Sequence, residues 1–209
     1  CSIIINMIKF QTIPLDIFES HNFQFLFYDL LSNKSNNEII EYVLYLIGLC
    51  TLNNIFSGFY NVDLFINIFS EYRFDENIRI LVLWNLSVGL SDEICHFLIE
   101  SEFLDNIVDI YQTSSFKLKH EISSLITDMM CISADPPDIF LSDQILEILV
   151  NSMIIFDDDV FKIGIALCQT IEDYIIQNQD EGERIEMMKQ YLIDLNIMEI
   201  IANLEENSS

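Results

Sequence analysis

Residues 78–90 constrain the fold of this chain more than any other stretch. They read Ile-Arg-Ile-Leu-Val-Leu-Trp-Asn-Leu-Ser-Val-Gly-Leu, apolar at nearly every position, with Asn85 in the middle and Gly89 near the end. A helix with so little polar surface cannot keep one face in water, so it must pack between neighbouring elements. The amide of Asn85 therefore needs a partner, either inside the protein or on a ligand.

The rest of the chain is built from similar segments. It has only 5 glycines and 3 prolines in 209 residues, so its turns must be made by Asn, Ser and Asp clusters. Short alternating runs bounded by glycine, the pattern of strands, do not occur. Apolar segments of helix length alternate with brief polar breaks. The segments expected to be helical are residues 15–20, 23–31, 38–50, 62–70, 77–88, 92–100, 104–111, 118–131, 144–155, 160–177, 184–192 and 197–204.

The long helices recur at a regular spacing. When they are aligned, Asn85, Asp128 and Thr170 fall in one column at intervals of about 43 and 42 residues, the period of armadillo and HEAT units. The helix before them is offset, with Gly48 roughly one short repeat upstream of Asn85. One repeat cannot bury its apolar face, so three or more must stack into a continuous core. We therefore expect a single all-α solenoid with units of roughly residues 10–52, 53–90, 91–133 and 134–177, and a partial unit at 184–205.

The charge of the chain bears on its partners rather than on its fold. It has 34 acidic and 9 basic side chains, a formal net charge of -25. This imbalance disfavours nucleic acid and anionic membranes as partners and favours a basic peptide or a basic protein surface. A second interpretation stays open, in which the charge keeps a Phe- and Ile-rich chain soluble.

Nothing in the sequence indicates an enzyme, a metal site or a cofactor. There is no Gly-rich phosphate loop, no G-x-S-x-G turn and no HExxH, and the three histidines have no recurring ligand spacing. The five cysteines are odd in number and scattered in apolar surroundings, so we expect small buried side chains in a reducing compartment. Because the chain begins with Cys1 rather than Met, we expect a fragment or a processed chain.

Residues 85–89, Asn-Leu-Ser-Val-Gly, resemble the inner helix of an importin-α armadillo repeat, which typically reads Trp-x-x-x-Asn followed by a small residue and Gly. The likeness continues collinearly. Residues 120–128 stand where that family has Lys-Glu-Ala-Ala-Trp-Ala-Ile-Ser-Asn, residues 160–176 are similar to the inner helix of the ninth repeat, and residues 193–201 match a late Gly-Leu-Asp-Lys-Ile segment. The resemblance covers roughly residues 40–205 and implies a right-handed armadillo-repeat solenoid, with about four to five repeats in this chain.

In that family the inner helices line a concave groove that holds an extended nuclear localisation signal. An Asn amide pairs with the peptide backbone, a Trp one turn earlier packs against Lys or Arg stems, and carboxylates bind the charged heads. The resemblance places Asn85, Leu81, Glu121, Ser124 and Asp128 at groove positions. Asn85 and Glu121 keep the family's residue types, Asp128 replaces an Asn, and Leu81 and Ser124 replace the two tryptophans.

Trp84 does not restore the missing slot, since it lies three residues from Leu81 at a different angle around the helix, and we expect it to be a core aromatic. Asn85 has two open interpretations, a groove residue or an amide that is hydrogen-bonded within the core.

The resemblance implies an importin-α-like nuclear transport adaptor, or its C-terminal part, found in cytoplasm and nucleus. Its expected partners are basic peptide or protein cargo in the groove, and importin-β-like and export receptors and certain nucleoporins near the acidic C-terminal repeats. The changed groove residues support an alternative hypothesis, a divergent armadillo-repeat scaffold that does not bind localisation signals.

Overall fold

The computed structural model describes residues 23–32, 36–53, 61–133, 139–155 and 160–177, together with the single positions 182, 186, 190 and 193. All regular secondary structure in these residues is helical, which confirms the all-α class. The helices expected at 15–20 and 197–204, and most of the one at 184–192, lie outside the described residues.

The observed helices begin and end within two residues of the expected bounds. Two of them, at Asp92–Glu100 and Val160–Gln177, agree at both ends. The helices are α3 (Phe23–Ser32), α4 (Asn37–Leu52), α5 (Val62–Glu71), α6 (Glu76–Val88), α7 (Asp92–Glu100), α8 (Phe103–Tyr111), α9 (Phe116–Ile132), α10 (Asp143–Ile155) and α11 (Val160–Gln177).

The polar breaks supply the residues that start the helices. In five helices a side-chain oxygen just before the first turn accepts a hydrogen bond from a backbone N–H two or three residues later, which satisfies one of the free donors of the helix end. Helix α8 differs, because Glu102 precedes it in a left-handed conformation (φ 58°) without a side-chain cap. The five capping residues are Asn36, Asn61, Asp75, Ser91 and Ser115.

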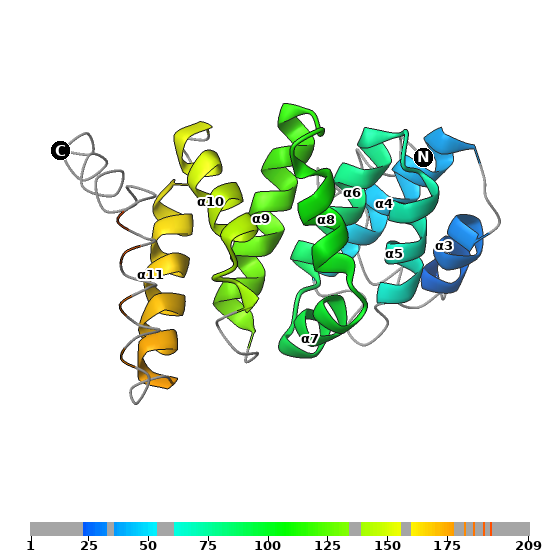
Figure 1. Cartoon of the computed structure of the whole chain (residues 1–209). Coiled ribbons are helices and arrows are strands. Elements are labelled where there is room, and N and C mark those ends of the chain that lie inside the picture. Colours follow the sequence, from blue (N-terminus) through cyan, green and yellow to red (C-terminus); the bar gives the residue numbers. More distant parts are fainter. Residues whose placement is uncertain are drawn as a thin grey trace. The chain divides into compact units, whose positions relative to one another are not determined.

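The described contacts divide the chain into two compact units, Cys1–Leu90 and Ser91–Ser209. In the first unit α4 packs against α3 and α6, and α6 also packs against α5 (Figure 1). Ile78, Val82 and Leu86 of α6 are fully buried. Residues 78–90 are therefore packed between neighbouring helices, as expected.

In the second unit α9 occupies the centre. It contacts α7, α8, α10 and α11, and α10 also packs against α8 and α11 (Figure 1). Ile122, Leu125, Ile126 and Met129 of α9 are fully buried. Both units thus have an apolar helical core, whereas the single solenoid and its repeat boundaries stay predictions.

Among the described helices, none combines the length and the apolar character that crossing a membrane requires.

Candidate functional site

Asn85 lies in the α4–α6 interface and is fully buried. Its Nδ2 donates one hydrogen bond to the backbone oxygen of Leu44 on α4, at 3.0 Å, and another to the backbone oxygen of Leu81, at 2.7 Å. The two N–H groups of the amide thus have two acceptors inside the protein. This geometry agrees with the second interpretation of Asn85, an amide that is hydrogen-bonded within the core.

Leu81 is brought next to Asn85 on the same face of α6, one turn earlier. Its backbone oxygen accepts from the Asn85 amide, and its side chain is half-buried. An aliphatic side chain offers apolar contact at this position but no aromatic ring for a cation.

Trp84 stacks on Tyr45 of α4, with ring centroids 5.7 Å apart and the ring planes 23° from parallel. Both side chains are half-buried, so the expectation of a core aromatic at Trp84 is wrong in part. Trp84 lies against Gly48 of α4, where an added Cβ would clash with the six-membered ring of the indole. The sequence held one signal of this contact, a glycine in the middle of an otherwise large-residue helix.

Acidic side chains gather where α4 and α6 begin. Asp75 caps α6 and accepts a hydrogen bond from Asn37 Nδ2 at 2.7 Å. Desolvation, followed by the charges of Asp75 and Glu38, raises the pKa of Glu41. We name Glu38, Glu41 and Asp75 the acidic cluster. The sequence does not indicate this cluster, because Asp75 follows Glu38 by 37 positions and Glu41 by 34, and it meets them only through the packing of α4 on α6.

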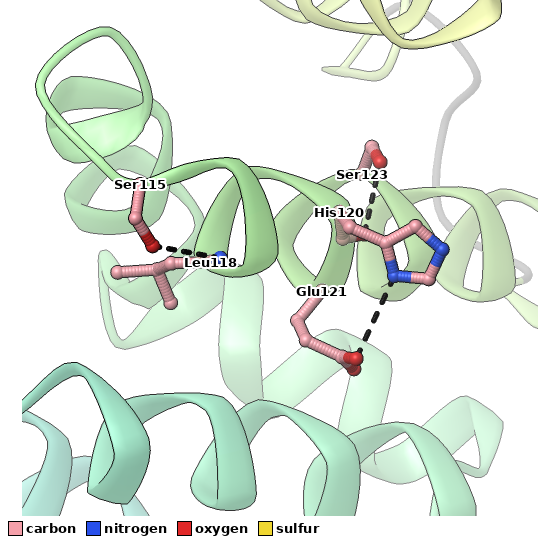
Figure 2. A network of polar contacts seen from close by, with 5 residues as sticks. All are labelled: Ser115, Leu118, His120, Glu121 and Ser123. Carbon is pink, nitrogen blue, oxygen red and sulfur yellow. Dashed lines mark hydrogen bonds and ion pairs between the residues drawn. The ribbon is translucent and has the colours of Figure 1, made fainter. Parts of the chain in front are cut away.

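The second unit holds Glu121, Ser124 and Asp128, all half-buried on α9. Their spacing of three and four residues puts them on one face of the helix. Figure 2 shows the polar contacts at the start of this helix, where the His120 ring approaches Glu121, with Nδ1 and Oε1 3.6 Å apart. In the same view Ser123 Oγ donates to the backbone oxygen of His120 at 2.9 Å.

Asp128 is already engaged by a cation of the same unit. Its Oδ1 lies 2.7 Å from the Nζ of Lys162, which projects from α11. The third residue of the predicted column, Thr170, is buried, and its hydroxyl donates to the backbone oxygen of Ala166 at 2.9 Å. The sequence does not indicate a role for Lys162, because an aligned column shows which residues share a position and not which side chains reach across to it.

The five predicted groove residues thus form two sets, Leu81 with Asn85 on α6 and Glu121, Ser124 and Asp128 on α9. Each set belongs to its own unit. Their joint role in binding a peptide stays a prediction.

Two of the four described cysteines are exposed, whereas the sequence predicted that the cysteine side chains are buried. Cys50 and Cys95 are buried, but Cys131 and Cys168 are exposed, and all four are free thiols. Cys131 stands in the last turn of α9 and Cys168 within α11, and each is exposed although its neighbours in the sequence are largely apolar. Cys1 lies outside the described residues.

In the described part of the chain no group of three or more His, Cys, Asp or Glu side chains is arranged to hold a metal ion. Comparison with protein-family models, curated proteins and solved structures found no match for this chain.

Proposed function

We propose that this chain is an armadillo-repeat solenoid similar to the C-terminal part of importin α. In this proposal it is a binding protein rather than an enzyme. It holds basic localisation-signal peptides at Leu81 and Asn85 of the first unit and at Glu121, Ser124 and Asp128 of the second. It binds transport receptors near its acidic C-terminal repeats and moves between cytoplasm and nucleus.

The observation that carries the proposal is that, in both units, hydrogen bonds join alternate helices whose partners lie about one repeat length apart in the sequence. Asn85 pairs with Leu44 across 41 residues in the first unit, and the hydroxyls of Tyr111 and Ser152 pair at 3.1 Å across 41 residues in the second. These bonds join α4 to α6 and α8 to α10. The same two helix pairs are also joined by Asn37 with Asp75 across 38 residues and by Gln112 with Glu147 across 35 residues. Intervals close to one repeat length between packed alternate helices are typical of stacked helical repeats and support the solenoid.

The charge supports the class of partner. A formal net charge of -25 raises the local concentration of cationic ligands and speeds their association, an effect that falls steeply with salt. A Lys- or Arg-rich segment is therefore the cargo chemistry that suits this chain best.

The test is binding of a fluorescently labelled Lys-rich localisation peptide to the full chain, followed by anisotropy at rising ionic strength. The matched control is the same peptide with each Lys replaced by Gln. We expect binding of the Lys-rich peptide that weakens with salt and no binding of the control. Absence of binding at low ionic strength would overturn the peptide-binding part of the proposal.

A second candidate function, a scaffold of the same repeat type that binds no localisation signal, is favoured by one observation. The carboxylate of Asp128 is occupied by Lys162, and the amide of Asn85 by two backbone oxygens, so both side chains already serve the protein itself. Purification from cell extract distinguishes the two functions. Co-purification of importin-β-like or export receptors supports the adaptor, and a stable partner without transport receptors supports the scaffold.

A further inference from the structure

Two arginine side chains are held at the corner where α5 ends and α6 begins. Arg79 Nε donates to the backbone oxygen of Phe69 at 3.2 Å, and its guanidinium lies 4.6 Å from the centroid of the Phe69 ring. Arg73 belongs to the connection between the two helices, and its guanidinium lies 4.7 Å from the centroid of the Phe74 ring. Each guanidinium therefore lies on an aromatic ring, which limits its motion before any ligand arrives.

The end of α5 brings the two arginines together. In a helix the backbone oxygen of Phe69 points toward the backbone N–H four residues later, which belongs to Arg73. Arg79 Nε binds this same oxygen, so its guanidinium lies beside the chain at Arg73. Burial lowers the pKa of the Arg79 guanidinium, the charge of Glu76 raises it, and the charge of Arg73 lowers it. The two cations thus repel each other, and a bound anion would relieve this repulsion.

Neither arginine forms an ion pair within the described residues, where the ion pairs involve two histidines and Lys162. Arg79 is half-buried and uses one of its five N–H donors on Phe69, whereas Arg73 is exposed. Their remaining N–H groups have the fork geometry that matches the oxygens of a carboxylate or a phosphate. The chain has 34 acidic and 9 basic side chains, so two arginines outside such pairs distinguish this corner from the rest of the described surface.

The charge of the whole chain decides which anion suits the corner. A formal net charge of -25 repels an extended acidic peptide. A phosphorylated side chain instead brings nearly two negative charges and three acceptor oxygens to the position of one residue. Phe74 is 88 % exposed beside Arg73, so it offers apolar surface to the residues that flank the phosphate.

We propose that Arg73 and Arg79 form a binding site for the phosphate group of a phosphorylated peptide side chain, with Phe74 in contact with the peptide next to it. The Nη groups of both arginines donate hydrogen bonds to the phosphate oxygens. The site lies between α5 and α6 of the first unit (Figure 1). It uses none of the five residues proposed to hold a basic peptide, and its ligand has the opposite charge.

The test follows the phosphorus NMR signal of a short phosphoserine peptide, with otherwise uncharged residues, as the full chain is added. Inorganic phosphate is the second probe. An excess of the same peptide with Asp at the phosphoserine position, added as a competitor, shows whether a carboxylate binds equally well. The variants are Arg73→Gln, Arg79→Gln and Arg79→Lys. The control is Lys117→Gln, which removes an exposed cation from α9.

We expect the phosphopeptide signal to shift and broaden equally with the unmodified chain and with Lys117→Gln. Arg73→Gln and Arg79→Gln should each weaken binding about tenfold, because each removes charge-assisted hydrogen bonds to the phosphate. Arg79→Lys should also weaken binding, since a point charge does not replace the guanidinium fork. Circular dichroism verifies that each variant is folded. If Arg79→Gln does not fold, the exposed Arg73 still provides the test.

An unchanged phosphorus signal, or equal affinities of Arg73→Gln and the unmodified chain, would overturn the site. Binding of inorganic phosphate without binding of the phosphopeptide would overturn the peptide as its ligand. Equal competition by the Asp peptide would overturn the preference for phosphate. None of these measurements uses a Lys-rich peptide, so failure of this site is distinguishable from failure of the proposed function.

Discussion

The side-chain nitrogen of Asn85 donates to the backbone oxygen of Leu44 at 3.0 Å, across the interface of α6 and α4. Asn85 and Leu44 are both fully buried, so water cannot replace this partner. Sliding α6 along α4 would leave the amide without its acceptor in an apolar environment, at a cost of about 1–3 kcal/mol. The bond therefore favours one register between two otherwise apolar helices.

Replacing Asn85 should destabilise the first unit. In Asn85→Ala the oxygen of Leu44 loses its donor and a small cavity remains, so we expect a loss of about 1–3 kcal/mol in the free energy of unfolding. Urea denaturation followed by circular dichroism measures this loss. Asn67→Ala, at an exposed position of α5, is the control and should stay within about 0.5 kcal/mol. Equal stabilities of the two variants would contradict the prediction.

The sequence predicted the helices well, because apolar periodicity and polar breaks are local signals. Helix α7 at Asp92–Glu100 and helix α11 at Val160–Gln177 were expected at these bounds. The candidate site depended on contacts between helices, which a pattern along one chain does not contain. Lys162 reaches Asp128 from another helix, and Trp84 lies over Gly48 because of the way α6 crosses α4. Sequence alone placed Trp84 in the core, since its indole is large and apolar.

Gly48→Ala tests the contact under Trp84. In an ordinary helix interior this change stabilises by about 0.5–1 kcal/mol. At Gly48 the new methyl group would overlap the indole, so Trp84 must move off Tyr45, and we expect lower stability with a shift in Trp84 emission. Gly182→Ala is the matched control, because a Cβ there meets nothing within 4 Å. Equal gains in stability from both changes would refute the predicted overlap.

The four described cysteines should react in two groups. Burial raises the pKa of the Cys50 thiol to about 12, so at pH 8 it is protonated as well as covered. Cys95 is buried too, whereas Cys131 and Cys168 are exposed. Brief treatment of the native protein with iodoacetamide at pH 8, followed by peptide mass spectrometry, should show modification of Cys131 and Cys168 first. In urea, where the chain is unfolded, all four should react at similar rates. If the native protein also reacted at one rate at all four cysteines, the assigned burial would be wrong.

The Asp128–Lys162 pair should contribute little to stability and depend on salt. The two side chains are 20 % and 47 % exposed, and pairs in such positions contribute about 0.2–1 kcal/mol. A double-mutant cycle with Asp128→Asn and Lys162→Met should give a coupling energy in this range that shrinks at high salt. Lys117→Met, at an exposed position of the same helix α9, should show no coupling to Asp128→Asn. A coupling energy independent of salt would contradict a solvent-exposed ion pair.

Glu41 should oppose folding at neutral pH. Its pKa is raised in the folded protein by desolvation and by the charges of Asp75 and Glu38. Between the unfolded and the folded pKa the native state therefore binds more protons than the unfolded state, so stability falls as pH rises through this window. Below the unfolded pKa the carboxyl is protonated in both states and the penalty is absent.

Glu41→Gln should therefore be more stable than the unmodified chain at pH 7, and the difference should vanish as the pH falls below the unfolded pKa of a Glu carboxyl. Urea denaturation at a series of pH values measures both effects. Asp63→Asn removes an equal charge from the first turn of α5, where a carboxylate is favourable, and should give no gain at pH 7. A destabilised Glu41→Gln at pH 7 would contradict the repulsion on which this argument depends.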